Sequence, residues 1–206
     1  NIVFIANPNN PTGSYIPKEA IHRLRAGLRE DIILALDGAY AEYMSAEDYS
    51  DGRELVETTN TVIFRTFSKA YGLSTLRIGW GYGPKHIIDM LYKVRSPFNI
   101  TQPSLDAAIA ALQDQAYLQT HVKANNAQRA RIESTLTALG LTVHPSYANF
   151  VLAAFPNAAE ANGYLNDRGI IVREVANYGL PDCLRISVGR PNENDVLLGA
   201  LGEYLA

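Results

Sequence analysis

Short apolar segments alternate with longer amphipathic segments along the first part of the chain, and this alternation restricts the possible folds most strongly. Residues 2–6 and 32–36 are apolar over their whole length, and residues 61–66 contain a continuous apolar run at 62–64. A strand of this kind is buried on both faces, as in a parallel sheet that helices cover on both sides. The pattern therefore predicts an α/β fold with a mainly parallel sheet between helical layers.

The alternation of strands and helices continues to the end of the sequence. Further strands are expected at residues 77–82, 150–154, 170–174 and 184–188. Helices are expected at residues 17–28, 84–94, 104–139, 158–168 and 194–204. Gly140 follows the longest of these helices and suits its C-terminal cap. We place a domain boundary inside that helix, between residues 118 and 119.

The composition argues against several classes of function. Lys and Arg number 18 against 21 Asp and Glu, whereas a nucleic-acid-binding protein normally presents a basic face. No apolar stretch approaches the ~20 residues of a membrane span. The single cysteine, Cys183, is typical of a reducing compartment, so we expect a cytoplasmic protein. The four histidines lack the paired spacing of metal ligands, and we expect no metal site.

Polar side chains gather where the predicted strands of the first half end, or just after. They are Asn10, Asp37, Tyr40, Thr66, Ser68, Lys69 and Arg77. In open α/β sheets, ligands bind at the carboxyl ends of the strands. These residues are therefore the candidate ligand-binding set of the first half of the chain.

Five short motifs in this order resemble the class I/II aminotransferases, which are fold-type I pyridoxal-phosphate enzymes. The motifs are Asn-Pro-Thr-Gly at 10–13, Asp-Gly-Ala-Tyr at 37–40, Ser-Lys-Ala-Tyr-Gly at 68–72, Arg77 eight residues after Lys69, and Leu-Arg-Ile-Ser-Val-Gly at 184–189. The resemblance covers the whole chain. It implies a three-layer αβα cofactor domain, present in part as residues 1–118, and a small α+β domain at residues 119–206.

Lys69 is the central residue of the resemblance. The family implies that its amine forms a Schiff base with the aldehyde of pyridoxal 5′-phosphate and later shuttles a proton for the substrate. A lysine suits both roles because its neutral amine is nucleophilic and basic. Asp37 is implied to pair with the pyridine nitrogen, which keeps the ring able to accept electrons.

The other candidates of the first half are implied to hold the rest of the cofactor. Asn10 and Tyr40 would donate hydrogen bonds to its phenolic oxygen. Arg77 would bind the cofactor phosphate through its planar guanidinium, with the hydroxyl groups of Thr66 and Ser68 as neutral donors.

The second half of the chain resembles histidinol-phosphate aminotransferases in particular. The matching stretches are residues 65–73, 94–99, 148–152, 170–174 and 178–189. Histidinol phosphate has no α-carboxylate but carries a phosphate, and the resemblance implies that Arg173 and Arg185 bind it. Asn149 would lie near the substrate. An exposed strand charge without a ligand is an equal alternative for Arg173.

The resemblance predicts transamination between L-histidinol phosphate and 2-oxoglutarate in histidine biosynthesis. Three alternatives remain: an aromatic or other amino-acid aminotransferase, a decarboxylase of the threonine-phosphate type, and an aminotransferase-like sensing domain of a regulator. The implied partners are a small-molecule amino donor, a 2-oxo acid and a second copy in a homodimer, with no nucleic acid and no membrane.

Two features qualify these expectations. Gly38 stands where the family usually has glutamate, and we expect this to change local packing rather than the chemistry. The Asn-Pro-Thr-Gly motif lies close to residue 1, whereas the resemblance places it in the middle of the cofactor domain. We therefore expect the 206 residues on their own to bind the cofactor poorly.

Overall fold

In the computed structural model, which describes residues 1–206, the chain forms two compact units. The first unit comprises residues 1–9 and 15–121, and the second comprises residues 10–14 and 122–206. The second unit therefore includes the Asn-Pro-Thr-Gly segment, although this segment precedes most of the first unit in the sequence.

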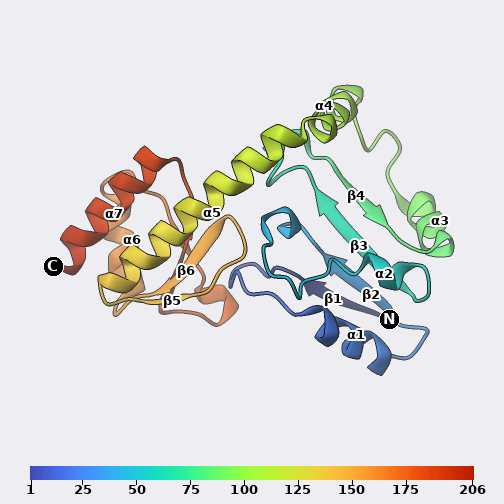
Figure 1. Cartoon of the computed structure of the whole chain (residues 1–206), viewed down its shortest axis with the longest axis horizontal. Helices are drawn as coiled ribbons and strands as arrows, with labels where there is room; N and C mark the ends of the chain where they lie inside the picture. The colour runs from blue at the N-terminus through green and yellow to red at the C-terminus, as the bar shows by residue number, and fades with distance from the viewer. The chain divides into compact units, whose positions relative to one another are not determined.

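A four-stranded sheet forms the centre of the first unit (Figure 1), and its order is β1-β2-β3-β4. The strands are β1 (Ile2–Ala6), β2 (Ile33–Asp37), β3 (Thr61–Thr66) and β4 (Gly79–Tyr82). The first three strands are parallel, and β4 pairs antiparallel with β3. The prediction of an α/β fold with a mainly parallel sheet is confirmed.

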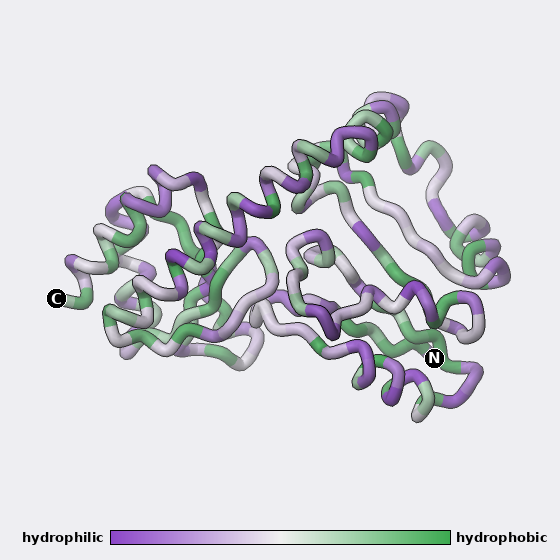
Figure 2. Tube along the Cα trace, viewed as in Figure 1, coloured by the Kyte–Doolittle hydropathy of each residue, from purple (hydrophilic) through white to green (hydrophobic).

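Apolar side chains of β2 and β3 pack against two helices, α1 (Lys18–Gly27) and α2 (Arg53–Val56). Ile21 of α1 is fully buried among Leu34 and Ile63. Figure 2 shows hydrophobic residues along the strands and more polar residues along α1. Burial of these apolar groups on the sheet is what holds the helices in place.

The predicted strand at 77–82 is shorter than expected, since β4 begins only at Gly79. A short 3-10 turn, η2 (Ser74–Leu76), precedes it, and Arg77 ends that turn in the left-handed conformation with φ 50°. This conformation is incompatible with an extended strand. Gly79 opens the strand because a Cβ there would lie 2.5 Å from the carbonyl oxygen of Arg65.

The single helix predicted at 104–139 is wrong, because two helices occupy this region. They are α4 (Gln102–Gln113) and α5 (Gln115–Ala138), and α3 (Lys85–Val94) precedes them. Asp114 separates the two: its backbone has left the helical region, and its carboxylate Oδ1 accepts a hydrogen bond from the Tyr117 backbone N–H at 2.9 Å. Asp114 is thus the N-terminal cap of α5.

Replacing Asp114 with alanine is expected to lower the free energy of unfolding by about 1 kcal/mol, the usual cost of losing such a cap. Thermal unfolding of the Asp114→Ala and Asp114→Asn variants measures this. Asparagine keeps a capping oxygen and should retain most of the stability. Equal losses in both variants would contradict the capping role.

The second unit contains an antiparallel sheet of order β5-β6-β8-β7. Its elements are β5 (Thr142–His144), β6 (Phe150–Ala154), α6 (Ala158–Asn166), β7 (Arg173–Glu174), β8 (Cys183–Ser187) and α7 (Pro191–Leu205). Another 3-10 turn, η3 (Ala176–Tyr178), lies between β7 and β8. The sequence pattern did not predict β5, and β7 is shorter than the predicted strand 170–174.

The core of the second unit lies between one face of this sheet and α5, α6 and α7. Ile132, Leu165 and Leu201 are fully buried there, against Val151 and Leu184 of the sheet. Because side chains alternate along a strand, the residues between these, including Arg185, point to the other face. The helices therefore cover one face and leave the arginine-bearing face outside this core.

No helix of the structure combines the length and the apolar character that crossing a bilayer requires.

Candidate functional site

The carboxyl ends of β2 and β3 bring one group of predicted site residues together. Asp37 is the last residue of β2, and it lies in register with Phe64 of the neighbouring strand β3. The turn after β2 is held by hydrogen bonds from the Gly38 N–H to the Phe64 carbonyl oxygen at 2.8 Å and from the Ala39 N–H to Asp37 Oδ1 at 3.0 Å. These bonds fix the backbone of the turn that carries the side chains of Asp37 and Tyr40.

Lys69 lies in a tight loop after β3. Its neighbours Phe67 and Ala70 are buried, and the Gly72 N–H bonds to the Lys69 carbonyl oxygen at 2.9 Å. The Lys69 Nζ is 5.3 Å from the ring centre of Tyr40, within the range of a cation–π contact. The structure therefore places the predicted amine beside the predicted tyrosine.

Arg77, Ser68 and Thr66 form a small group of cationic and hydroxyl donors. The Arg77 Nη1 donates to Ser68 Oγ at 3.3 Å and to the Ser74 carbonyl oxygen at 2.9 Å. The Thr66 Oγ1 accepts from the Ser68 backbone N–H at 3.0 Å. Arg77 is exposed and adopts a left-handed backbone conformation that is uncommon for a non-glycine residue. Such conformations gather at functional sites.

Tyr71 follows Lys69 by two residues and packs on Phe67, with the ring centres 4.9 Å apart. Burial raises the pKa of the Tyr71 phenol above its ordinary value, with the Glu42 carboxylate adding to the shift. The phenol is therefore a hydrogen-bonding and packing group rather than a base at neutral pH.

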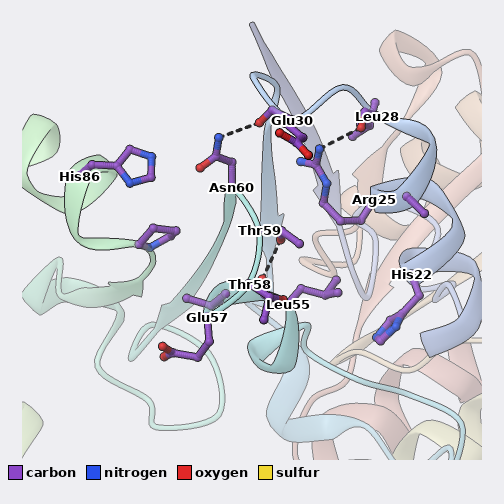
Figure 3. A pocket seen from close by; sticks show the side chains of 13 residues that line it. His22, Arg25, Leu28, Glu30, Leu55, Glu57, Thr58, Thr59, Asn60 and His86 are labelled. Carbon is purple, nitrogen blue, oxygen red and sulfur yellow. Dashed lines mark hydrogen bonds between the residues drawn. The ribbon is translucent and has the colours of Figure 1, made fainter.

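A cavity of about 830 Å³ lies at the other end of the same strands (Figure 3). Its lining includes Glu30 and Asn60, which precede β2 and β3. The most buried charge there, Arg25, already donates to the backbone carbonyl oxygens of Ile32, Leu28 and Arg29 at 2.7, 3.1 and 2.7 Å. This arginine supports the local chain path, and the residues that line the cavity include no lysine.

Two arginines face each other on the second sheet. Arg173 of β7 lies directly opposite Arg185 of β8 in the antiparallel register. Residues in such a pair point to the same face with their Cβ atoms about 5 Å apart, and like charges there destabilise the sheet. Two adjacent guanidinium groups that repel each other are well suited to an anionic ligand.

Arg185 is also bonded to the Asn-Pro-Thr-Gly segment of its own unit. Its Nη1 donates to Asn10 Oδ1 at 2.7 Å, and its guanidinium lies 5.1 Å from the ring centre of Phe150. The buried Nε of Arg185 has no hydrogen-bond partner. The guanidinium is thus oriented by Asn10 while part of its donor capacity remains unused.

The loop before β6 also bonds to the Asn-Pro-Thr-Gly segment. The Tyr147 N–H donates to the Gly13 carbonyl oxygen at 2.8 Å. Gly13 has φ +74°, and a Cβ on it would lie 2.3 Å from Ser146 Oγ, so only glycine fits. Asn149 follows in this loop, and its carbonyl oxygen accepts from the Val188 N–H at 2.9 Å.

The structure thus brings the predicted residues together in two groups, one in each unit. Asp37, Tyr40, Thr66, Ser68, Lys69 and Arg77 belong to the first unit, and Asn10, Asn149, Arg173 and Arg185 belong to the second. The sequence analysis missed a buried ion-pair cluster next to the first group, formed by Arg65, Glu42 and Asp51. A charged residue, Arg65, directly after the apolar run 62–64 of a predicted strand is the signal that could have revealed it.

The family model for aminotransferases of class I and II matches residues 1–201. Histidinol-phosphate aminotransferase from Rhodopseudomonas palustris (strain BisA53) is 48% identical over 211 residues, covering 100% of this chain and 58% of that protein. The protein of the same name from Rhodospirillum centenum is 48% identical over 99% of the chain and 58% of its own length. The chain thus spans less than two thirds of the length of these curated relatives.

Solved structures agree with the sequence comparison. Histidinol-phosphate aminotransferase from Sinorhizobium meliloti, in complex with pyridoxal-5′-phosphate, superposes with a TM-score of 0.90 at 34% identity, over 99% of this chain and 57% of that one. L-threonine-O-3-phosphate decarboxylase from Porphyromonas gingivalis has a TM-score of 0.86 at 27% identity, over 100% and 64%. Given the family match over nearly its whole length, the chain belongs to the class I and II aminotransferases.

Proposed function

We propose that the protein catalyses pyridoxal-phosphate-dependent transamination from L-histidinol phosphate to 2-oxoglutarate, as a step of histidine biosynthesis. The observation that carries the substrate proposal is the Arg173–Arg185 pair, which places two cations directly opposite each other on one face of the sheet. A phosphate ester satisfies both guanidinium groups. The 48% identity to histidinol-phosphate aminotransferases supports the same substrate.

The donor groups of the first unit fit pyridoxal 5′-phosphate. They comprise a carboxylate, an amine beside a tyrosine ring, and an arginine bonded to a serine hydroxyl. The carboxylate suits the ring nitrogen of the cofactor, the amine suits its aldehyde, and the arginine with the hydroxyl suits its phosphate. When bound, the cofactor supplies an electron-accepting ring that stabilises negative charge on the substrate carbon.

Each residue then has a distinct role. Lys69 is the residue that would hold the aldehyde carbon of the cofactor, and its amine, when free, would take the proton from the substrate carbon that bears the amino group. Asp37 holds a proton on the ring nitrogen. Tyr40 donates a hydrogen bond to the phenolic oxygen. The loop that carries Lys69 is packed through Phe67, which limits the positions its amine can reach.

The remaining assignments concern anions and the second unit. Arg77, with Thr66 and Ser68, binds the cofactor phosphate. Asn10 donates to the phenolic oxygen through its amide nitrogen, because its amide oxygen already accepts from Arg185. Asn149 lies near the substrate. We further propose that the protein works as a cytoplasmic homodimer.

The test is to supply the complete protein with pyridoxal phosphate and 2-oxoglutarate and to measure glutamate formed with histidinol phosphate, phenylalanine or threonine phosphate as donor. We expect histidinol phosphate to give the highest kcat/KM. Glutamate formation from phenylalanine alone would favour an amino-acid aminotransferase instead. Release of carbon dioxide from threonine phosphate would favour a decarboxylase, whose structural counterpart is the Porphyromonas gingivalis enzyme. No turnover of any donor would favour a ligand sensor.

A further inference from the structure

A buried group of charges lies beside the turn that carries Asp37 and Tyr40. Arg65 Nη2 bonds to Glu42 Oε1 at 2.7 Å, and its Nη1 bonds to Asp51 Oδ2 at 2.8 Å. The side chains of Arg65, Glu42 and Asp51 are only 12%, 7% and 8% exposed. We call these three residues the Arg65 cluster.

The Arg65 cluster joins the segments that carry the candidate cofactor residues. Glu42 belongs to a 3-10 turn, η1 (Ala41–Tyr43), two residues after Tyr40. Arg65 is the penultimate residue of β3, four residues before Lys69. The Arg65–Glu42 ion pair therefore connects the turn that carries the tyrosine to the strand that leads to the lysine.

Gly38 is the position that makes room for this connection. A Cβ on residue 38 would lie 3.0 Å from Arg65 Cδ and 3.3 Å from the Phe64 carbonyl oxygen. The backbone of Gly38 does not have a positive φ, so a side chain at this position is limited by space rather than by backbone conformation, and a Cβ would press on Arg65.

The charges of the cluster depend on one another. Burial alone would raise the pKa of Asp51, but hydrogen bonds from Arg53 and the charges of Arg53 and Arg65 hold it below its ordinary value. Asp51 is therefore ionised at neutral pH. Two buried atoms, Glu42 Oε2 and Arg65 Nε, have no hydrogen-bond partner. Loss of the Arg65 charge would leave the buried Glu42 carboxylate without its ion pair, and loss of the Glu42 charge would remove the contact that joins Arg65 to the turn after Tyr40.

We propose that the Arg65 cluster positions the turn carrying Asp37 and Tyr40, with Glu42 and Asp51 holding the Arg65 guanidinium between them and Gly38 leaving space for its side chain. The proposal rests on the proposed function, because this turn is the segment assigned to the ring of pyridoxal phosphate. These residues touch neither cofactor nor substrate in this assignment, so they are positioning residues. They act through the placement of Asp37 and Tyr40.

The experiment uses Glu42→Gln and Gly38→Ala in the complete protein, with pyridoxal phosphate as the probe. Both variants are expected to raise the Kd for the cofactor at least about tenfold. They should also shift the pH midpoint of the visible absorption of the bound cofactor, because Asp37 and Tyr40 set the electronic environment of its ring. Thermal unfolding of each variant is measured alongside.

Two matched controls separate positioning from general stability. Glu54→Gln removes a glutamate whose side chain is 31% exposed and which pairs with Lys18 and His22 outside the cluster. Gly27→Ala adds a methyl group where no atom lies within 4 Å. Both should leave the Kd and the pH midpoint as in the unmodified protein.

The outcomes are distinguishable. Variants that melt earlier but keep the Kd and pH midpoint of the controls would overturn the positioning role and leave the proposed function intact. An unmodified protein that does not bind pyridoxal phosphate would overturn both. If Glu42→Gln does not fold, Gly38→Ala decides, since it leaves every charge in place.

Discussion

The Lys69→Ala variant is expected to lose transamination by roughly 10²–10⁴-fold in kcat, the range that a positioned proton-transfer group contributes. The visible absorption that arises when the cofactor is bonded to a lysine should disappear as well. The physical reason is that Lys69 supplies the amine beside Tyr40, with its Nζ 5.3 Å from the ring centre. Stopped-flow kinetics and an absorption spectrum of the variant measure the two effects.

Two further variants sharpen this test. Lys69→Arg keeps the positive charge, but a guanidinium stays protonated and cannot act as nucleophile or base, so it should be as inactive as alanine. Lys123→Ala removes an exposed lysine of α5 and should behave as the unmodified protein. Turnover by Lys69→Ala at a rate near that of Lys123→Ala would exclude Lys69 from the mechanism.

The second large effect is expected at the arginine pair. Arg185→Ala removes a guanidinium that Asn10 orients and whose Nε is buried. If Arg185 pairs with the substrate phosphate as proposed, truncating it should cost about 2–5 kcal/mol, as for a buried hydrogen-bonded charge pair, which corresponds to a loss of roughly 30- to 4,000-fold in kcat/KM. Arg185→Lys should recover little of this, because an ammonium cannot bind bidentately.

Arg173→Ala is expected to act selectively. Arg173 is exposed and faces Arg185 across the strand pair, so its loss should lower kcat/KM for histidinol phosphate by about tenfold or more, as 1.4 kcal/mol of lost binding would. A donor without phosphate should be affected much less. Because the substitution also relieves repulsion between two like charges, it should not lower the melting temperature.

The control for the arginine pair is Arg168→Ala, which removes another exposed arginine of the second unit. This variant should leave kcat/KM unchanged for both the phosphorylated and the non-phosphorylated donor. Equal losses for phosphorylated and non-phosphorylated donors in Arg173→Ala would remove Arg173 from the phosphate site. They would favour the reading of Arg173 as an exposed strand charge.

Local patterns were sufficient to locate the main strands. The segments 2–6 and 61–66 coincide with β1 and β3, and 150–154 coincides with β6. β3 and β6 are largely buried, so their apolar residues follow one another in the sequence. β1 is equally apolar, but Ile2 and Phe4 are exposed, so the expectation that this strand is buried on both faces is wrong. The helix break at Asp114 was missed because both flanking segments favour helix, and the break depends on one carboxylate bonding to the Tyr117 N–H.

Short or irregular elements were not predictable in the same way. β5 has three residues and β7 has two, which is too short for an alternating pattern to emerge. Arg77 was placed in a strand because apolar residues and glycines follow it, whereas its left-handed backbone ends a 3-10 turn. A single residue in that conformation produces no repeating pattern of apolar and polar residues from which it could be predicted.

The amino-acid sequence by itself determined the alternation of strands and helices, the mainly parallel sheet and, through five motifs in order, the family and the candidate residues. Only the tertiary structure decided which of these side chains lie together. It showed Arg173 opposite Arg185, Asn10 bonded to Arg185, and Arg65 paired with carboxylates 23 and 14 residues away. The reason is that hydrophobic periodicity records how each segment is buried, whereas strand register and non-local ion pairs depend on the path of the whole chain.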